Sequence, residues 1–385
     1  MKIVPFETRP YVWALAEDHG FTFHTIEGEE YWHEARAYQF TMAQVENDLE
    51  KPSNELVDMS YELVEETLKR EDWLRKLAIP EYTWEWLKRS WDRDDTTLYG
   101  RFDFCYDGKG PAKLLEFNAD TPTSLYESAV FQWIWLEDMI AQGKVPVTAD
   151  QFNSIEDKLK NGLLELAIDG ILHLACVTES DEDTGTVRYL EGLFRQTGVD
   201  TQLLDIADIG IDQYGRFTDL QDRVITHLFK LYPWEMLVRE EFGQSLPRSG
   251  IQFWEPPWKM ILSNKGILPL LWEMYPDHPN LLPAYFEDDP RCVNLGQRYV
   301  RKPIFSREGA NITLVDGERI ITLEGDYGAE GHILQALCPL PEFQGYSAVI
   351  GSWVIRGEAA GIGIREDQGP ITTNRSRFVP HYILG

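Results

Sequence analysis

Charged and apolar side chains alternate along two short runs of this chain, residues 101–105 and 114–118. A period of two predicts β-strands, because successive side chains of a strand point to opposite faces. The connection between the runs contains Asp107-Gly108 and Gly110-Pro111, two dipeptides typical of tight turns. We therefore expect an antiparallel hairpin centred on residues 109–110.

One face of this hairpin gathers polar side chains. The expected register places Asp103 opposite Glu116, and Arg101 opposite Asn118. Two carboxylates and an amide oxygen are hard ligands that suit Mg²⁺, particularly when phosphate groups complete its shell. A solvated strand face would show the same alternation, so the pattern alone leaves both interpretations open.

The segment after the hairpin joins it to a long apolar pattern of helical spacing that runs to residue 140. Thr121, Thr123 and Ser124 precede that pattern with Pro122 among them, and such residues favour helix caps and first turns. Free amides and hydroxyls at a helix start would form an anion site beside the proposed metal site. Simple capping is the alternative interpretation.

The middle of the chain has the pattern of a β-α-β unit, with strands at 171–177 and from 202 onward and a helix at 184–197. An acidic run at 179–183 lies between the first strand and the helix, where parallel sheets bind ligands. The carboxylates of Glu179, Asp181 and Glu182 are therefore candidates for holding a polyamine. A solvated acidic loop is the other interpretation. Residues 1–97, in contrast, are predicted to be mostly helical and rich in tryptophan.

The last 120 residues are dense in predicted strands. Lys302 lies on the strand 298–304, and a polar, glycine-containing loop at 306–311 follows it. A lysine that contacts phosphate as a point charge, with loop amides covering it, is a common way to hold a triphosphate. Neither a Walker loop nor a G-x-G-x-x-G motif accompanies it. Further strands are expected at 312–315, 320–323, 332–337, 347–355 and 359–365.

Composition narrows the function classes. The chain has 385 residues and a formal net charge of −28. This charge disfavours nucleic acid and anionic membranes as partners and favours a cationic substrate. Solubility alone would also explain the charge. No apolar run approaches the 18 or so residues that span a bilayer, and the N-terminus lacks a signal-peptide pattern, so we expect a cytoplasmic protein. The four cysteines are far apart in the sequence and are expected to be reduced thiols.

Several long segments resemble the synthetase domain of glutathionylspermidine synthase and its single-domain acid–amine ligase relatives. The resemblance runs from about residue 21 to 383 and is carried by residues 114–138, 262–276, 302–312 and 350–367. It implies an α/β, ATP-grasp fold of the circularly permuted type, with a pre-ATP-grasp-like β-α-β region. It also implies a single module over 1–385, without an N-terminal amidase domain. Its subregions would be 1–97, 98–150 (metal-site hairpin and helix), 151–260 (β-α-β region) and 261–385 (nucleotide binding).

The resemblance also implies ATP and Mg²⁺ as cofactors, and a role for each candidate residue. Asp103, Glu116 and Asn118 resemble the Mg²⁺ ligands. The nucleotide would be held by Lys265, Lys302, Ser306, Gly309, Gln335 and Leu337. The acyl-transfer arginines and the residues that hold the acid would be Arg101, Arg365, Thr123 and Ser124.

These implications predict an ATP-dependent ligase that joins a carboxylic acid to an amine through an acyl phosphate. The acid would be a small molecule or a glutathione-like peptide, and the amine would be polyamine-like. A catalytically silent ATP-binding sensor or assembly protein is the main alternative. A hydrolase that uses Asp103 and Glu116 as an acid/base pair is a third.

Overall fold

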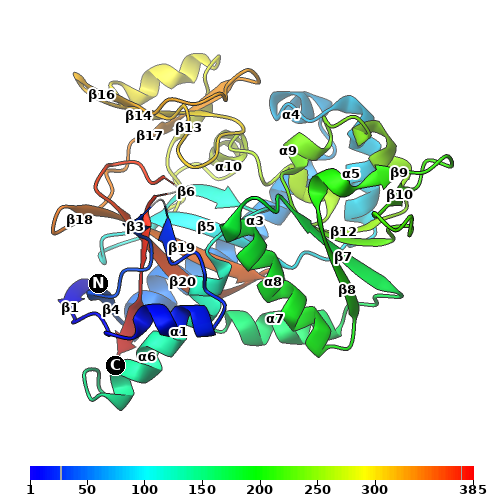
Figure 1. Ribbon diagram of the computed structural model, residues 1–385. Coiled ribbons are helices and arrows are strands. Elements are labelled where there is room, and N and C mark those ends of the chain that lie inside the picture. The colour runs from blue at the N-terminus through cyan, green and yellow to red at the C-terminus, as the bar shows by residue number, and fades with distance from the viewer. Residues whose placement is uncertain (27, 374) are drawn as a thin grey trace.

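The two alternating runs form adjacent antiparallel strands, β5 (Tyr99–Cys105) and β6 (Lys113–Asn118), at one edge of a six-stranded sheet. The structure is a computed structural model that describes residues 1–26, 28–373 and 375–385. The other strands of this antiparallel sheet come from the C-terminal part of the chain: β18 (Glu342–Phe343), β19 (Tyr346–Ile355), β20 (Glu358–Asp367) and β21 (Arg377–Val379). Residues more than 200 positions apart in the sequence therefore share one sheet (Figure 1).

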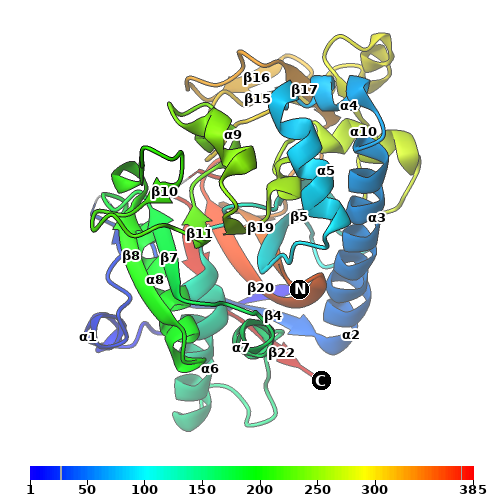
Figure 2. The ribbon, with the colours of Figure 1, turned by 90° about the vertical axis from the view of Figure 1, so that its right-hand side faces the viewer.

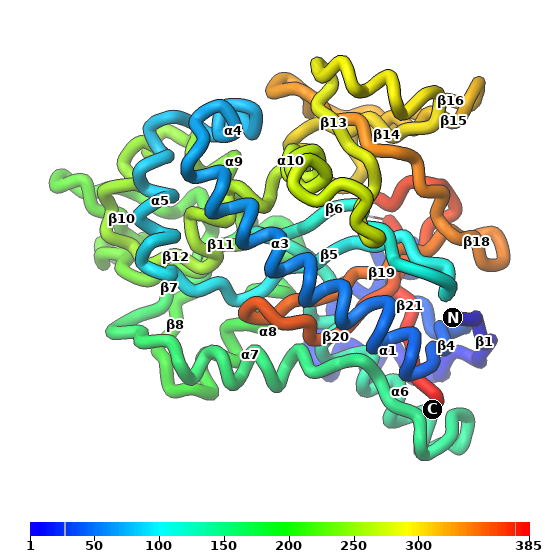
Figure 3. The backbone as a smooth tube through the Cα atoms, turned by 180° about the vertical axis from the view of Figure 1, so that it is seen from behind, coloured from blue at the N-terminus to red at the C-terminus, as the bar shows by residue number. Residues whose placement is uncertain are grey.

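The apolar face of the hairpin packs into the main core. Phe102 and Phe104 of β5 and Phe117 of β6 are buried in one cluster with Leu56 and Leu63. Both leucines belong to helix α3 (Lys51–Thr67), whose apolar residues recur at the predicted helical spacing. Figure 3 shows α3 crossing the six-stranded sheet, where it contacts β19 and β20. With one face of the hairpin fixed by this packing, its polar face is directed the other way.

A five-stranded antiparallel sheet lies above the hairpin in the view of Figure 1. Helix α10 (Ile267–Met274) packs against it through β13 and β17. In spatial order, its strands are β13 (Ala284–Phe286), β17 (His332–Ala336), β14 (Arg298–Pro303), β15 (Thr313–Asp316) and β16 (Arg319–Thr322). The strand that carries Lys302 and its neighbours in this sheet agree with the predicted strands to within about two residues.

The predicted β-α-β unit is confirmed as part of a four-stranded parallel sheet. β7 (Ile171–Cys176) and β8 (Asp200–Asp205) pair in parallel and are joined by helix α8 (Asp181–Gln196). Strands β11 (His227–Leu231) and β12 (Gln252–Trp254) complete the sheet, and α7 (Ile155–Leu164) packs beside α8. Figure 2 shows this sheet on the side of the molecule away from α3.

A three-stranded sheet brings the two ends of the described chain together. The central strand β4 (Arg36–Thr41) pairs with β1 (Lys2–Pro5) in antiparallel and with β22 (His381–Leu384) in parallel orientation. The sequence did not predict β1 or β4, because the strand that completes their sheet comes from the opposite end of the chain. The prediction of helices is confirmed from residue 42 onward.

The remaining elements are short or peripheral. The helices are α1 (Val12–Asp18), α2 (Met42–Val45), α4 (Glu71–Lys76), α5 (Trp84–Asp92), α6 (Gln132–Ala141) and α9 (Trp234–Leu237). Two small strand pairs are β2 (Thr25–Ile26) with β3 (Glu29–Glu30), and β9 (Gly210–Ile211) with β10 (Phe217–Thr218). The π- and 3₁₀-helical turns are Glu46–Glu50, Glu81–Thr83, Glu127–Phe131, Ile206–Asp208, Gly243–Arg248, Pro257–Met260 and Pro290–Leu295. Within the described ranges, no helix has the length and apolar character needed to cross a membrane.

A buried ion pair ties the segment after β6 to the parallel sheet. Lys230 Nζ on β11 lies 2.6 Å from Asp120 Oδ1, and both side chains are fully buried. The second carboxylate oxygen, Oδ2, accepts a hydrogen bond from the backbone N–H of Trp234 at 2.9 Å. The indole ring of Trp234 also lies against the ammonium group, 4.1 Å from its centroid.

We expect Lys230→Met to lower the free energy of unfolding by about 3–5 kcal/mol, because it leaves the Asp120 carboxylate buried without its counter-charge. Chemical denaturation followed by tryptophan fluorescence measures this loss. The matched control, Lys69→Met, removes an exposed lysine paired with Glu65 and Glu66 and is expected to change the free energy of unfolding far less, because water screens the exposed pairs. Equal effects of the two substitutions would contradict the structural role of the buried pair.

Candidate functional site

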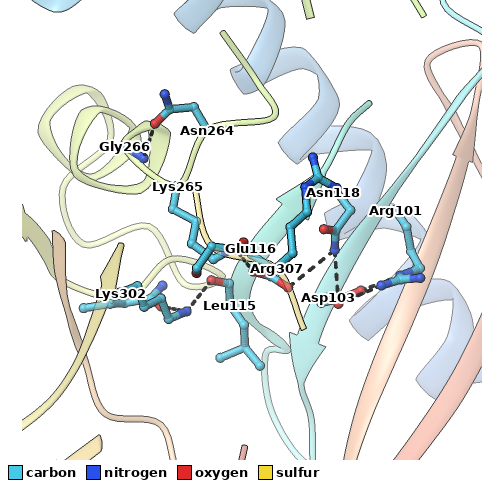
Figure 4. Close-up of polar contacts among 12 residues, drawn as sticks. Arg101, Asp103, Leu115, Glu116, Asn118, Asn264, Lys265, Gly266, Lys302 and Arg307 are labelled. Carbon is cyan, nitrogen blue, oxygen red and sulfur yellow. Dashed lines mark hydrogen bonds and ion pairs between the residues drawn. The ribbon is translucent and has the colours of Figure 1, made fainter. Parts of the chain in front are cut away.

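The polar face of the hairpin has the register that the sequence predicted. Asp103 pairs with Glu116, and Arg101 pairs with Asn118. Arg101 and Asp103 are not part of a solvated face, because only 4% and 2% of them are exposed, whereas Glu116 and Asn118 are half-buried. The site is therefore a largely buried group of charges at the edge of the six-stranded sheet (Figure 4).

Asp103 is the centre of this group. Its Oδ1 accepts from Arg101 Nε at 2.6 Å, and its Oδ2 accepts from Arg101 Nη2 at 3.0 Å. Arg365 Nη2 and Asn118 Nδ2 also donate to Oδ2, at 2.9 and 3.2 Å. Two guanidinium groups and one amide thus hold a single carboxylate, an arrangement in which charge-assisted hydrogen bonds fix the geometry.

A β-bulge changes the second half of the hairpin. The pairing shifts between Asp103 and Phe104, so that Phe104 lies opposite Leu114 and Leu115 is the extra residue. Leu115 lines the cleft, and its carbonyl oxygen accepts a hydrogen bond from Lys302 Nζ at 2.9 Å. Strict alternation along β6 would put Leu115 on the apolar face with Phe117, but the alternation of a strand does not continue through a bulge.

Two lysines reach this hairpin from the C-terminal part of the chain (Figure 4). Besides Leu115, Lys302 Nζ bonds to Gln335 Oε1 at 2.8 Å. Lys265 Nζ lies 2.8 Å from Glu116 Oε2 and donates to the carbonyl of Ser306 at 2.7 Å. The resemblance implied nucleotide-binding roles for Lys265, Lys302, Gln335 and Ser306, and the structure brings these residues to the hairpin.

In each of these groups, burial and the nearby opposite charge act on the pKa in opposite directions. Burial lowers the pKa of Lys302 to about 8, although Glu116 opposes this shift. Burial also disfavours the charged form of Glu116, but the ammonium groups of Lys265 and Lys302 more than compensate and hold its pKa below the ordinary value. Glu116 is therefore a carboxylate at neutral pH.

These residues line one cleft of about 490 Å³. Six basic and six acidic side chains line it, so the cleft is balanced in charge although the whole chain carries −28. The predicted site residues that line it are Arg101, Asp103, Glu116, Asn118, Thr123, Lys265, Lys302, Ser306, Gly309, Leu337 and Arg365. Gln335 lies behind Lys302, and Ser124, Glu179, Asp181 and Glu182 are not among the lining residues.

The loop 306–310 extends across the cleft toward the parallel sheet. Arg307 Nη1 donates to Thr121 Oγ1 at 2.7 Å, and Arg307 Nη2 lies 2.9 Å from Glu235 Oε1. Gly309 has a φ of +75°, and a Cβ there would meet the carbonyl oxygen of Thr372 at 2.8 Å. The sequence predicted the loop but did not single out Arg307. Its position in the glycine-containing loop after Lys302 could have indicated that it lies at the site.

Residues 121–124 lead directly into a helix. Helical structure begins at residue 125, and the carbonyl oxygen of Ser124 accepts from the Ser128 N–H at 3.2 Å, so Ser124 occupies the N-cap position, with a φ of +64°. Arg101 Nη1 donates to the carbonyl of Thr123 at 2.6 Å and contacts Ser124 Oγ at 3.3 Å. This short extended segment is thereby fixed beside Asp103, and Thr121, Pro122 and Thr123 line the cleft.

The acidic run is also not a loop throughout, as the sequence had suggested. Ser180 caps α8 by accepting from the N–H of Asp183, so Asp181, Glu182 and Asp183 form the first helical turn. Asp181 and Glu179 are exposed, whereas Glu182 and Asp183 are half-buried. Negative charge is favourable at a helix N-terminus, which explains why the run starts the helix.

Three carboxyl groups near this helix start have raised pKa values. Burial, together with Glu182, raises the pKa of Asp183 to about 7 and that of Glu127 to about 8. Burial also raises the pKa of Glu182, with Thr123 and Arg365 opposing the shift. Glu127 Oε1 accepts from Tyr31 Oη at 2.5 Å, and its Oε2 finds no hydrogen-bond partner among the described residues. The sequence missed Glu127, because it lies within an otherwise apolar helical pattern.

The oxygen ligands of the hairpin suit a Mg²⁺ ion that phosphate groups also bind, rather than a metal ion held by protein ligands alone. Asp103, Glu116 and Asn118 offer two carboxylates and an amide oxygen, the oxygen chemistry that Mg²⁺ prefers. Among the residues that the structure describes, no group of three or more His, Cys, Asp or Glu is placed to hold a metal ion. An ion here would thus share its shell with non-protein oxygens, as Mg²⁺ does at phosphate sites.

Comparison with known proteins identifies the family. The family model described as "Glutathionylspermidine synthase preATP-grasp" matches residues 4–384. The chain belongs to the glutathionylspermidine synthase family. It is 36% identical to the "Putative acid–amine ligase" of Haemophilus influenzae, over 100% of this chain and 99% of that protein.

Longer family members are also similar. The trypanothione synthetase of Crithidia fasciculata is 29% identical over 84% of this chain and 53% of its own length. The bifunctional glutathionylspermidine synthetase/amidase of Escherichia coli is 28% identical over 88% of this chain. The chain spans only a little over half of these two proteins, whose named activities come from longer chains. These relatives are ligases, so the family supports a ligase function for the chain.

A solved structure supports the fold. The glutathione synthetase-like effector GSS30 of Globodera pallida, determined in its apo form, superposes with a TM-score of 0.56 over 98% of each chain. The sequence identity is 11%, so this similarity concerns the fold alone. Together with the family, it confirms the mixed α/β fold of ATP-grasp type that the sequence resemblance implied.

We expect the substitution Glu127→Gln to change how stability depends on pH. A carboxyl whose pKa is about 8 when folded and near 4.5 when unfolded keeps its proton in the folded protein while the unfolded chain loses it. Glu127 therefore makes the wild type lose stability as pH rises from about 5 to 8, by up to about 1.4 kcal/mol per pH unit, and the variant lacks this contribution, so its slope is shallower. Denaturant unfolding measured at several pH values gives this difference.

The exposed residue Glu85, on α5, provides the control, because Glu85→Gln should leave the wild-type pH slope unchanged. Parallel pH profiles for wild type and Glu127→Gln would show that Glu127 is ionised in the folded protein at neutral pH.

Proposed function

We propose that the protein is an ATP-dependent acid–amine ligase that forms an amide bond through an acyl phosphate. The observation that carries this proposal is the meeting of two lysines with a carboxylate pair in one cleft. Lys265 and Lys302 come from the nucleotide-binding part, and Asp103 and Glu116 come from the hairpin. Such a cleft can bring a triphosphate, a metal ion and a second anion together.

In the proposed first step, an oxygen of the substrate carboxylate attacks the γ-phosphorus of ATP, and the bond to the bridging oxygen breaks as ADP leaves. Two anions must approach each other, so positive charge has to offset their repulsion. Lys265 and Lys302 provide it from the nucleotide side. Mg²⁺ would stabilise the transferring phosphoryl group, and Asp103, Glu116 and Asn118 are the residues that would hold it. Phosphoryl transfer needs positioning and charge, not a covalent protein intermediate.

In the second step, the amine nitrogen attacks the acyl carbon, the carbon–oxygen bond to phosphate breaks, and the nitrogen loses a proton. Arg101 and Arg365 converge on Asp103 and line the cleft, where they would stabilise the negative charge of the acyl phosphate and the oxyanion. An arginine stays protonated at neutral pH and so cannot serve as the base.

The amine site is proposed at the start of α8. Asp183 lines the cleft, and the charge of Glu182 adds to the burial that raises the pKa values of Asp183 and Glu127. Burial raises the pKa values of these carboxyl groups by disfavouring their charged form, and a cationic amine bound beside them would stabilise that form. A polyamine-like amine and a glutathione-like acid are therefore the proposed substrates, in line with the names of the relatives. Exposed Glu179 and Asp181 would contribute only through long-range attraction.

Water must be excluded, because an acyl phosphate hydrolyses. The loop 306–310 is suited to this role, since Arg307 already anchors it to Thr121 and Glu235 on the opposite wall. Leu337 and the backbone around Gln335 would border the adenine. A cytoplasmic location stays a prediction from the sequence.

ADP release in the presence of Mg-ATP, small peptides with a free carboxylate and a panel of polyamines tests the proposal. We expect release only when a matched acid and amine are both present, with the amide product detected by mass spectrometry. The variant Asp103→Asn should lower turnover at least about 100-fold. The control Asp107→Asn, on the exposed turn of the same hairpin, should retain it.

Two results would contradict the ligase. Nucleotide binding without turnover for any pair would favour the sensor or assembly protein. Bond cleavage that needs no ATP and is lost in Asp103→Asn and Glu116→Gln would favour the hydrolase.

We expect Lys302→Met to weaken ATP binding at least about tenfold, because a charged hydrogen bond to phosphate is lost. Its free energy of unfolding should stay within about 1 kcal/mol of wild type, because removing a desolvated charge offsets the lost bonds to Leu115 and Gln335. Titration calorimetry and denaturant unfolding measure the two effects. Lys109→Met, on the exposed turn, is the matched control, and equal ATP affinity in both variants would refute the role of Lys302.

A further inference from the structure

Two of the four thiols touch each other beside the cleft. Cys338 Sγ lies 3.1 Å from Cys105 Sγ, although the residues are 233 positions apart in the sequence. The other two cysteines have no such partner: Cys176 is buried near Thr184, and Cys292 donates to the backbone carbonyl of Phe286. The contact is therefore specific to one pair of thiols.

The pair joins the two sheets that border the cleft. Cys105 ends β5, the strand of Asp103 in the six-stranded sheet. Cys338 follows β17 of the five-stranded sheet, lines the cleft and is next to Leu337. Cys105 Sγ also donates to the carbonyl of Pro339 at 3.4 Å, so this connection already rests against β5.

We propose that Cys105 and Cys338 form a reversible disulfide that fixes the two sheets to each other and slows nucleotide exchange in the cleft. A nucleotide that is held between two sheets leaves only when they separate, and such opening is often the slow step of turnover. A covalent link across the contact restricts that separation. The reduced form, with a contact but no bond, leaves the sheets free to move.

The chemistry requires a disulfide as oxidant, and a low-molecular-weight disulfide is the class that fits the half-buried Cys338. The Cys338 thiolate attacks one sulfur of the oxidant, whose other sulfur leaves and takes up a proton. The Cys105 thiolate then attacks Cys338 Sγ and expels the second small thiol, so that two protein thiols are oxidised and one disulfide is reduced to two thiols.

The surroundings favour this order of events. The two sulfurs are already in contact, and Cys105 is buried, so it is the less accessible of the two to an incoming disulfide. Cys338 is also the more exposed of the two and lines the cleft, through which a small disulfide can enter.

The test exposes the whole protein to oxidised glutathione and then to dithiothreitol. Mass spectrometry of a digest reports whether the peptides of Cys105 and Cys338 are linked, and stopped-flow fluorescence reports the release rate of a fluorescent ADP analogue. We expect the linked peptides after oxidation, release slowed at least about tenfold, and recovery of both readouts after reduction.

Cys105→Ser should show neither effect, and Cys292→Ser, which removes another half-buried thiol, should respond like wild type. Absence of the linked peptides, or linked peptides with an unchanged release rate, would overturn the proposal. The inference rests on the proposed function only in that the cleft binds a nucleotide. Failure of the reduced wild type to bind the analogue would contradict that function, whereas binding without linked peptides would contradict the disulfide alone.

Discussion

Two lysine side chains bridge the walls of the cleft, and the arrangement of the site depends on what holds their ammonium groups. Lys302 is held by a carbonyl oxygen that the β-bulge at Leu115 turns toward it, and Lys265 is held by the Glu116 carboxylate. Without these oxygens, two positive charges would be buried side by side at a large cost in free energy. The oxygens of the hairpin thus keep the lysines ready in positions where phosphate oxygens would be equally good partners. Stability and the proposed nucleotide binding would draw on the same two charges.

The charge of the cleft follows from this arrangement. The chain has 64 acidic and 36 basic residues, yet equal numbers of each line the cleft. A doubly or triply negative ligand would be repelled by the average surface, and only a site that concentrates basic side chains can accept it. Near α8, burial raises the pKa values of Asp183 and Glu127, and the charge of Glu182 adds to the effect. Asp183 lines the same cleft as the basic side chains, so the proposed anionic and cationic substrates would bind side by side.

Much of this site could be predicted from the sequence, and the reasons are local. The hairpin register follows from strand periodicity and two turn dipeptides, so the pairing of Asp103 with Glu116 needed no long-range information. The lysines of the nucleotide side were placed by resemblance to a family, and the structure brings them to the hairpin. What the sequence could not show depends on partners distant in the chain. The bulge at Leu115, the anchoring of Arg307 on Glu235 and the buried charge of Glu127 each require knowledge of what packs opposite.

The small sheet of β1, β4 and β22 has a consequence for biosynthesis. β4 is made early, but one of its two neighbours consists of residues 381–384. While the ribosome is still translating the middle of the protein, the edge of β4 that later pairs with β22 has no partner. Unpaired strand edges promote association between nascent chains. Folding of this sheet must therefore wait until residues 381–384 have left the ribosome, and chaperones that shield exposed strands would matter most during that interval. The late arrival of β22 makes closure of this sheet a step of high contact order, which is slow by its nature.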